Sequence, residues 1–193
     1  MAWVRFDRRA IPFVVAAALV FGQRMYATVV YTPVDITVTG TGILKIDLNH
    51  DGVTDVSIVY SGGSHFCPGA GLGGYGIVDA LPGANDATVA NGNYTLALSS
   101  GTKISSSRSF YSGEGFMLGY NTCLFPPHAN SGAWQDVFNH YVGVRFLISG
   151  HTHYGWARLS VLEGRSGPII TLTGYAYETI AGHGITAGQT SGP

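Results

Sequence analysis

Charged side chains are scarce in this 193-residue chain. Asp, Glu, Lys and Arg make up only 11% of it, against about 25% in an average soluble protein. That scarcity excludes a coiled coil or a long charged helix bundle, which would need many Lys, Glu and Arg residues. The 10 basic and 11 acidic residues also provide no basic field to hold nucleic acid, so we expect no nucleic-acid partner.

The chain also lacks an apolar run long enough to cross a membrane. Its longest such run, Ile11–Phe21, is far shorter than the roughly 20 residues that a spanning helix needs. Because three arginines precede this run, it is typical of a secretory signal, with cleavage predicted after Ala27. We expect residues 1–27 to be a signal peptide, with an uncleaved anchor as the alternative. Residues 28–193 then form a single secreted or periplasmic domain without a stable membrane span.

Cysteine is limited to Cys67 and Cys123. Two cysteines are too few for a structural zinc site, which takes four ligands. An even cysteine count in an exported chain favours a disulfide over free thiols. We therefore predict a bridge between Cys67 and Cys123, contributing about 4 kcal/mol through the closed loop.

What the chain has in abundance is short apolar runs with a period of two residues, separated by Gly, Asn, Ser or Pro. The clearest are Tyr141–Ser149 and Tyr154–Leu162, joined by a short turn, followed by Ile170–Ile180. β-Branched and aromatic residues in such runs predict an all-β fold, an antiparallel β-sandwich of jelly-roll type. The Gly-rich segment His65–Asn93 shows little periodicity, and we expect a long loop layer there.

The most specific local pattern is an Asp-rich loop with oxygen-bearing groups at alternate positions. Positions 1, 3, 5 and 9 are side chains and position 7 is a carbonyl; these residues are Asp47, Asn49, Asp51, Asp55 and Val53. With Gly52 at position 6, alternate oxygens converge on one point, which predicts a structural Ca²⁺ site. The loop is not an EF-hand, because Ile58 stands where the bidentate Glu belongs. The alternative is a plain Asp/Asn/Gly hairpin turn.

This DxNxDGxxD loop resembles the calcium loop carried on β-hairpins in integrin-type propeller repeats and in many exported bacterial proteins. The resemblance covers about a dozen residues. It implies the ion site and not the propeller fold, since a propeller would need several copies of the loop.

Aromatic residues make up 12% of the chain, and several stand beside Gly or polar residues, as sugar-stacking platforms do. These candidates for ligand stacking are Tyr75, Trp134, Tyr141 and Trp156. They support a carbohydrate-binding module as an alternative function. The competing interpretation is cross-strand and core packing, which is the more common use of aromatics in strands.

Other chemistry is weakly indicated. His151 and His153 lie two residues apart and offer the start of a metal site, but no third ligand has a suitable spacing. Glu114 and Glu178 lie in apolar, strand-like contexts where a carboxyl pKa can be perturbed, so a hydrolase of glycoside-hydrolase type is a third hypothesis. No catalytic residues are assigned, and we expect that the protein is not an enzyme.

Several short sequence motifs in the C-terminal third, together with the Asp-rich loop, indicate a resemblance that extends beyond the loop. They are YVGVRF at 141–146, YGWARL at 154–159 and GYAYE at 174–178. The chain is similar to a group of exported bacterial proteins of unknown function, many of which carry a membrane-sorting tail of PEP-CTERM type. No such tail is visible here, so we do not expect anchoring through one. The expected function is a structural or interaction module whose partner is an extracellular glycan or protein.

Overall fold

A computed structural model describes residues 28–67, 71–121, 128–162, 164 and 167–192. Within these residues the chain forms strands and turns and no helix, which confirms the predicted all-β class. This part of the chain therefore contains no helix that is long and apolar enough to cross a membrane. The predicted signal peptide and Cys123 lie outside the described residues, so the predicted cleavage and disulfide stay predictions.

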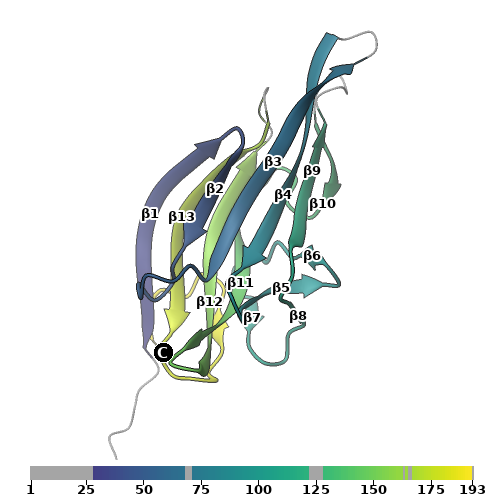
Figure 1. Cartoon of the computed structure of the whole chain (residues 1–193). Helices are drawn as coiled ribbons and strands as arrows, with labels where there is room; N and C mark the ends of the chain where they lie inside the picture. The colour runs from purple at the N-terminus through teal and green to yellow at the C-terminus, as the bar shows by residue number, and fades with distance from the viewer. Residues whose placement is uncertain (1–27, 68–70, 122–127, 163, 165–166, 193) are drawn as a thin grey trace, which may run out of the picture.

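The described residues form fourteen strands, labelled in Figure 1 where there is room. In the first half of the chain they are β1 (Val29–Thr39), β2 (Gly42–Ile46), β3 (Val56–Cys67), β4 (Gly71–Pro82), β5 (Ala87–Asn91), β6 (Tyr94–Thr95) and β7 (Lys103–Ile104). In the second half they are β8 (Phe110–Tyr111), β9 (Gly115–Asn121), β10 (His128–Gly132), β11 (Val137–Ile148), β12 (His151–Leu162), β13 (Ile169–Glu178) and β14 (Ile185–Thr186).

Hydrogen bonds join twelve of these strands into one large sheet. Its path runs β1-β13-β12-β11-β5-β6-β9-β4-β3-β2, with β10 added beside β9 and β8 beside β5. Pairing is antiparallel except between β6 and β9, and β7 and β14 form a separate small sheet. The large sheet curls until it is nearly closed into a barrel. The predicted sandwich of two separate sheets is therefore not confirmed, because β5 and β6 connect the two halves by continuous hydrogen bonding.

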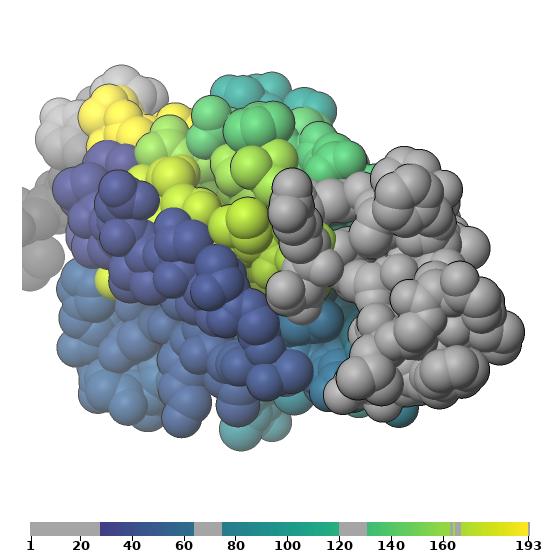
Figure 2. Space-filling model, turned by 90° about the horizontal axis from the view of Figure 1, so that it is seen from above, coloured from purple at the N-terminus to yellow at the C-terminus, as the bar shows by residue number. Residues whose placement is uncertain are grey.

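Strands from the two ends of the chain lie side by side. β1 pairs along its length with β13, and the register shifts between Pro33 and Ile36. Proline has no N–H to donate, so it is tolerated on a strand at the edge of a sheet. Figure 2 shows the N-terminal strands in purple and blue against the yellow-green C-terminal residues. The predicted hairpin of residues 141–162 is present as β11 and β12.

The core has two parts, one on each face of the β11–β12–β13 region. The larger lies inside the curled sheet, where β2, β3, β4 and β9 face β11, β12 and β13. Its largest side chains include Trp134, Phe146 and Leu48, all fully buried. The smaller part packs Tyr141, Tyr154 and Trp156 together with Ile104 and Ile185 of the small β7–β14 sheet.

The Gly-rich loop layer predicted for His65–Asn93 is wrong. Most of that segment belongs to β3, β4 and β5, and β3 and β4 form a long hairpin that projects beyond the rest of the sheet (Figure 1). The glycines of this hairpin allow neighbouring groups to pack closely against the main chain. A Cβ placed on Gly76 would collide with the ring of Tyr60, and one on Gly62 would lie 2.6 Å from the carbonyl oxygen of Tyr75. Glycine in a strand marks such close approaches.

Candidate functional site

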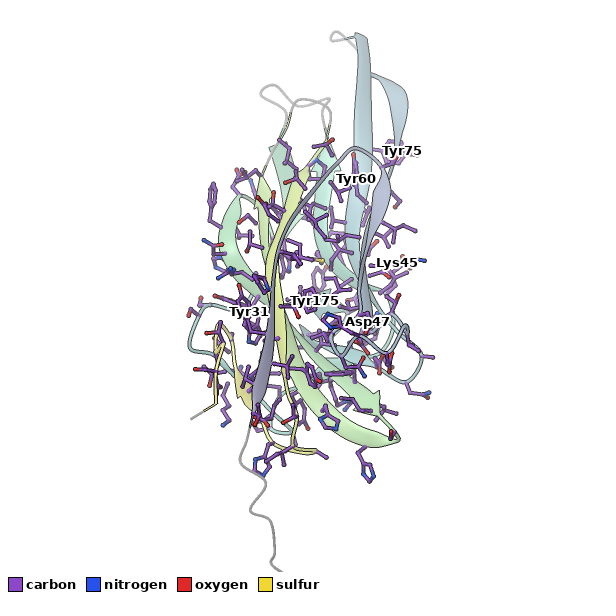
Figure 3. The ribbon with its side chains drawn as sticks, turned by 90° about the vertical axis from the view of Figure 1, so that its left-hand side faces the viewer. Tyr31, Lys45, Asp47, Tyr60, Tyr75 and Tyr175 are labelled. Atoms are coloured by element: carbon purple, nitrogen blue, oxygen red, sulfur yellow. The ribbon has the colours of Figure 1, made fainter. Side chains whose placement is uncertain are left out.

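The Asp-rich loop connects β2 to β3 and is anchored at both ends. The Asp55 N–H donates to the Ile46 carbonyl at 3.0 Å, which closes the hairpin. Between them, Leu48 is fully buried and fits over Gly155 of β12, where a Cβ would lie 2.5 Å from Leu48 Cδ2. The loop is therefore attached to the core through one apolar side chain, while Asp47 at its start lies near the surface (Figure 3).

Two carboxylates organise the loop from within. Asp47 accepts hydrogen bonds from the main-chain N–H groups of Asp51 at 3.2 Å and Gly52 at 2.8 Å. Asp51 accepts from the Val53 N–H at 2.8 Å and from the Asn49 side-chain amide at 3.0 Å. The Asn49 amide, and then the Val53 N–H, lower the pKa of Asp51. The acidic side chains thus hold the turn, as Asx turns do.

His50 connects the loop with β1 and β13, which stand at the other end of the strand order from β2. Its Nε2 lies 2.8 Å from the Tyr175 hydroxyl of β13 and 3.5 Å from Thr32 Oγ1 of β1. The His50 and Tyr175 rings meet edge to face with centroids 5.8 Å apart. The loop therefore bridges the edge at β2 and the edge at β1–β13, where the curled sheet comes closest to closing.

Asp55 points inward and is only 3% exposed. Its Oδ2 accepts the Leu48 N–H at 2.6 Å. Burial raises the pKa of Asp55 to about 7 despite that hydrogen bond, and the negative charges of Asp86, Asp47 and Asp51 raise it further. The surroundings of this buried carboxyl therefore disfavour its ionised form.

Asp86 joins this group from another part of the chain, and sequence reasoning did not place it there. It lies in the turn between β4 and β5, where the Gly83 N–H donates to the Asp55 carbonyl at 2.8 Å. Asp86 is buried. Burial raises its pKa to about 6, opposed by a hydrogen bond from the Leu147 main chain, and the Asp51 charge raises it further. No spacing rule connects residue 86 with residues 47–55, so only the fold reveals it.

The donor set suits a hard cation, because the side chains concerned offer only oxygen. However, among the described residues no three His, Cys, Asp or Glu side chains are close enough together to form a ready metal site. The Asp47 and Asp51 oxygens accept loop N–H groups instead. A bound ion would have to draw these oxygens together, and Asp55 and Asp86, which feel the charges of this loop, would be further carboxylates for it.

Three of the four predicted stacking aromatics are buried, so the stacking prediction is wrong for them. Trp134 and Trp156 have no exposed surface, and Tyr141 has 5%. Trp134 Nε1 donates to the Thr95 carbonyl at 3.0 Å, and Trp156 Nε1 to the Gln189 carbonyl at 3.2 Å. Tyr141 and Trp156 pack edge to face at 5.1 Å. All three side chains belong to the core, and the two indoles can be buried there because their N–H groups find main-chain acceptors.

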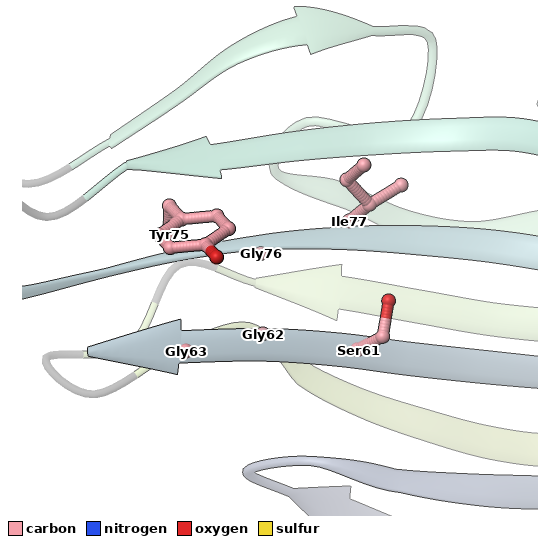
Figure 4. Close-up of a pocket in the computed structure, with 6 residues that line it drawn as sticks. All are labelled: Ser61, Gly62, Gly63, Tyr75, Gly76 and Ile77. Atoms are coloured by element: carbon pink, nitrogen blue, oxygen red, sulfur yellow. The ribbon is translucent and has the colours of Figure 1, made fainter. Parts of the chain in front are cut away.

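Tyr75, the fourth, has 55% of its surface exposed. It lies on the outer face of the β3–β4 hairpin beside a shallow depression of about 260 Å³. Figure 4 shows its ring next to Gly63, with Ser61 and Ile77 on the same face. A Cβ on Gly63 would lie 3.5–3.6 Å from the hydroxyl end of the Tyr75 side chain, so this end of the side chain lies beside the glycine.

The two predicted histidines differ in their surroundings. His151 is exposed at the β11–β12 turn, whereas His153 is buried with Nδ1 2.9 Å from the Glu178 carbonyl oxygen. The two predicted carboxyl groups also differ, because Glu114 is exposed and Glu178 is buried. Among the described residues, neither pair belongs to a group of three or more His, Cys, Asp or Glu side chains that could hold a metal ion.

Comparisons with known proteins give no relative from which a role could be transferred: no protein-family model, no curated protein and no solved structure matches the chain. Any role of this protein must therefore be inferred from its own residues.

Proposed function

We propose that the protein is exported, with its leader removed after Ala27, and acts as a non-catalytic structural or interaction module outside the cytoplasm. In this proposal Ca²⁺ stabilises the β2–β3 hairpin and the partner is an extracellular glycan or protein. The basic start and apolar run at the N-terminus support export.

The charge arrangement around Asp55 is the observation that carries the calcium proposal. A buried carboxyl faces the negative charges of Asp86, Asp47 and Asp51, and in their ionised forms these groups repel one another. A divalent cation with oxygen ligands would convert that repulsion into attraction. Extracellular calcium modules bind with Kd values of roughly 0.1–1 mM, so the ion would act as a structural component at the concentrations found outside cells.

Calorimetry on the exported protein tests this proposal. At 10 mM Ca²⁺ and such a Kd, binding adds about 1.4–2.7 kcal/mol, which corresponds to a rise in Tm of roughly 3–10 °C over a chelator-treated sample. Asp51→Ala should abolish the rise, whereas Asp35→Ala, at an exposed acid on β1, should preserve it. An unchanged Tm in 10 mM Ca²⁺, or an Asp51→Ala variant that responds like the parent, refutes the calcium site.

A carbohydrate-binding function is the second candidate, and the exposed ring of Tyr75 favours it. The hydroxyl end of the side chain lies beside Gly63 and the exposed ring borders a shallow depression, an arrangement that suits stacking of a sugar ring. A glycan array with the parent protein and Tyr75→Ala tests it. Tyr94→Ala is the matched control, because Tyr94 is also exposed but packs edge to face on Phe116 at 5.4 Å. Glycan binding that survives in Tyr75→Ala would rule out this platform.

A hydrolase remains the third hypothesis. Of the two carboxyls considered for it, Glu178 is buried and its Oε1 accepts the main-chain N–H groups of Thr28 and Ile180. Glu114 is exposed, and its charge raises the pKa of Asp79. If any glycan binds in the array, hydrolysis of that glycan by the parent protein and by Glu114→Gln would decide between binding alone and catalysis.

A further inference from the structure

Glu178 is a buried carboxylate at the C-terminal end of β13. It is 2% exposed, and its Oε1 accepts two main-chain N–H groups, from Thr28 at 3.2 Å and from Ile180 at 2.9 Å. Burying an ionised carboxylate is costly unless it is paired with charge or fully hydrogen-bonded. A positively charged donor in place of either main-chain N–H group would therefore stabilise the buried carboxylate.

Thr28 stands at the start of β1 and is held by the residues around Glu178. Its carbonyl accepts the Thr179 N–H at 3.1 Å, and the next residue, Val29, pairs with Glu178 in the β1–β13 register. The Thr28 nitrogen is thus fixed within hydrogen-bond distance of the buried carboxylate. It is also the nitrogen that leader removal after Ala27 would release.

We propose that leader cleavage creates an α-ammonium group at Thr28 that forms an ion pair with Glu178 and locks β1 onto β13. This rests on the export and processing proposed above. In the cleavage an export protease hydrolyses the Ala27–Thr28 peptide bond. Water supplies a hydroxyl to the Ala27 carbonyl carbon and a hydrogen to the Thr28 nitrogen, so the leader leaves as a carboxylate and the mature chain begins with an amine.

Processing thereby exchanges a neutral amide donor for a charged one at an already formed contact. A hydrogen bond in which both the donor and the acceptor are charged is shorter and stronger than one donated by a neutral amide. His153 of β12 is the titratable side chain that adjoins this point, with Nδ1 2.9 Å from the Glu178 carbonyl oxygen. His183 follows in the next turn, where its main-chain N–H donates to the Ile180 carbonyl at 3.1 Å. An α-amine ordinarily titrates near 8, between the usual ranges of histidine and tyrosine, so its titration can be observed separately.

The test uses the full-length gene expressed with its own leader in an exporting host. The intact mass of the exported product should correspond to a chain that begins at Thr28. After ¹³C-methylation of amines, the NMR titration of the α-amine should give a pKa at least one unit above the usual 7.7–8.0, because the carboxylate favours the charged form. Glu178→Gln should return it to that range, and Glu114→Gln, at an exposed glutamate, should not.

Stability gives a second measurement. The paired amine stabilises the fold fully below pH 7.7 and loses its effect as the pH rises through its raised pKa. The Tm of the exported protein should therefore exceed that of Glu178→Gln by about 3–8 °C at pH 7 and by much less at pH 10. If Glu178→Gln does not fold, the α-amine pKa of the parent decides by itself.

The outcomes separate the two proposals. An exported product that begins at another residue, or at Thr28 with an ordinary α-amine pKa, overturns the ion pair and leaves export intact. A product retained in the cytoplasm with its leader overturns export and the ion pair together.

Discussion

The most informative single substitution is Asp79→Asn, because Asp79 is a carboxyl in an apolar environment. It lies on the outer face of β4, between Val59 and Phe116 on the neighbouring strands. Ile77 and Leu81 flank it on the same face, and Asp79 is 8% exposed. Burial raises its pKa to about 6, and the negative charge of Glu114 adds to the rise.

The direction of the effect follows from proton linkage. A carboxyl whose pKa is higher in the folded state is more stable there in its neutral form, so its contribution is fully present below the unfolded pKa of 3.8 and is lost as the pH rises through about 6. A shift of about two units corresponds to roughly 3 kcal/mol, and local relaxation lowers that to about 1–3 kcal/mol. At pH 8, Asp79 therefore destabilises the fold, and Asp79→Asn should stabilise it by that amount.

Urea denaturation at several pH values between 3.5 and 8, in the presence of chelator, measures this effect. We expect the free energies of unfolding of the parent and Asp79→Asn to agree within about 0.5 kcal/mol at pH 3.5, where Asp79 is neutral. They should separate as the pH rises, with the variant more stable at pH 8. Asp35→Asn, at an exposed acid on β1, is the control and should show no comparable divergence. A variant that is less stable at pH 8, or a difference independent of pH, refutes the reasoning.

Two further predictions concern the attachment of the Asp-rich loop to the sheet. Gly155→Ala should destabilise the protein by about 1–3 kcal/mol in urea denaturation, because the new Cβ would lie 2.5 Å from Leu48 Cδ2. Gly42→Ala, whose Cβ would meet its nearest neighbour at 3.4 Å, should cost less than 1 kcal/mol. His50→Ala should lower the free energy of unfolding by about 1 kcal/mol, because the 2.8 Å contact with the Tyr175 hydroxyl is lost. Amide hydrogen exchange in the loop should become faster. Unchanged exchange rates would show that this contact does not hold the loop in place.

Strand content was largely predictable because alternation of apolar residues is a local property. Residues 141–149 and 154–162 were predicted as a hairpin, and the structure has β11 and β12 as a hairpin with slightly longer strands. The prediction failed in 65–93, where glycines interrupt the alternation of apolar and polar residues. At Gly76 the missing side chain makes room for the Tyr60 ring, and a local pattern contains no information about such a distant partner.

The candidate site divides in the same way. The spacing of Asp47, Asn49 and Asp51 predicts side-chain oxygens that converge on an ion, with a plain hairpin turn as the alternative. In the structure these oxygens accept main-chain N–H groups of the turn, and the ion stays a prediction. Asp86 was not predictable as its neighbour, since it reaches Asp55 through a turn between other strands. The same limit applied to the aromatics: local surroundings do not distinguish the exposed Tyr75 from the buried Trp156.

The sequence by itself determined the low charge, the all-β class, the position of the Asp-rich loop and the basic, apolar start, because composition and short-range spacing suffice for each. The tertiary structure alone decided that one sheet curls almost into a barrel, that Asp86 joins the loop and that Glu178 meets the Thr28 nitrogen. These features depend on pairing between residues far apart in the chain, such as Thr28 and Glu178, and pairing of that kind is set by packing of the whole core.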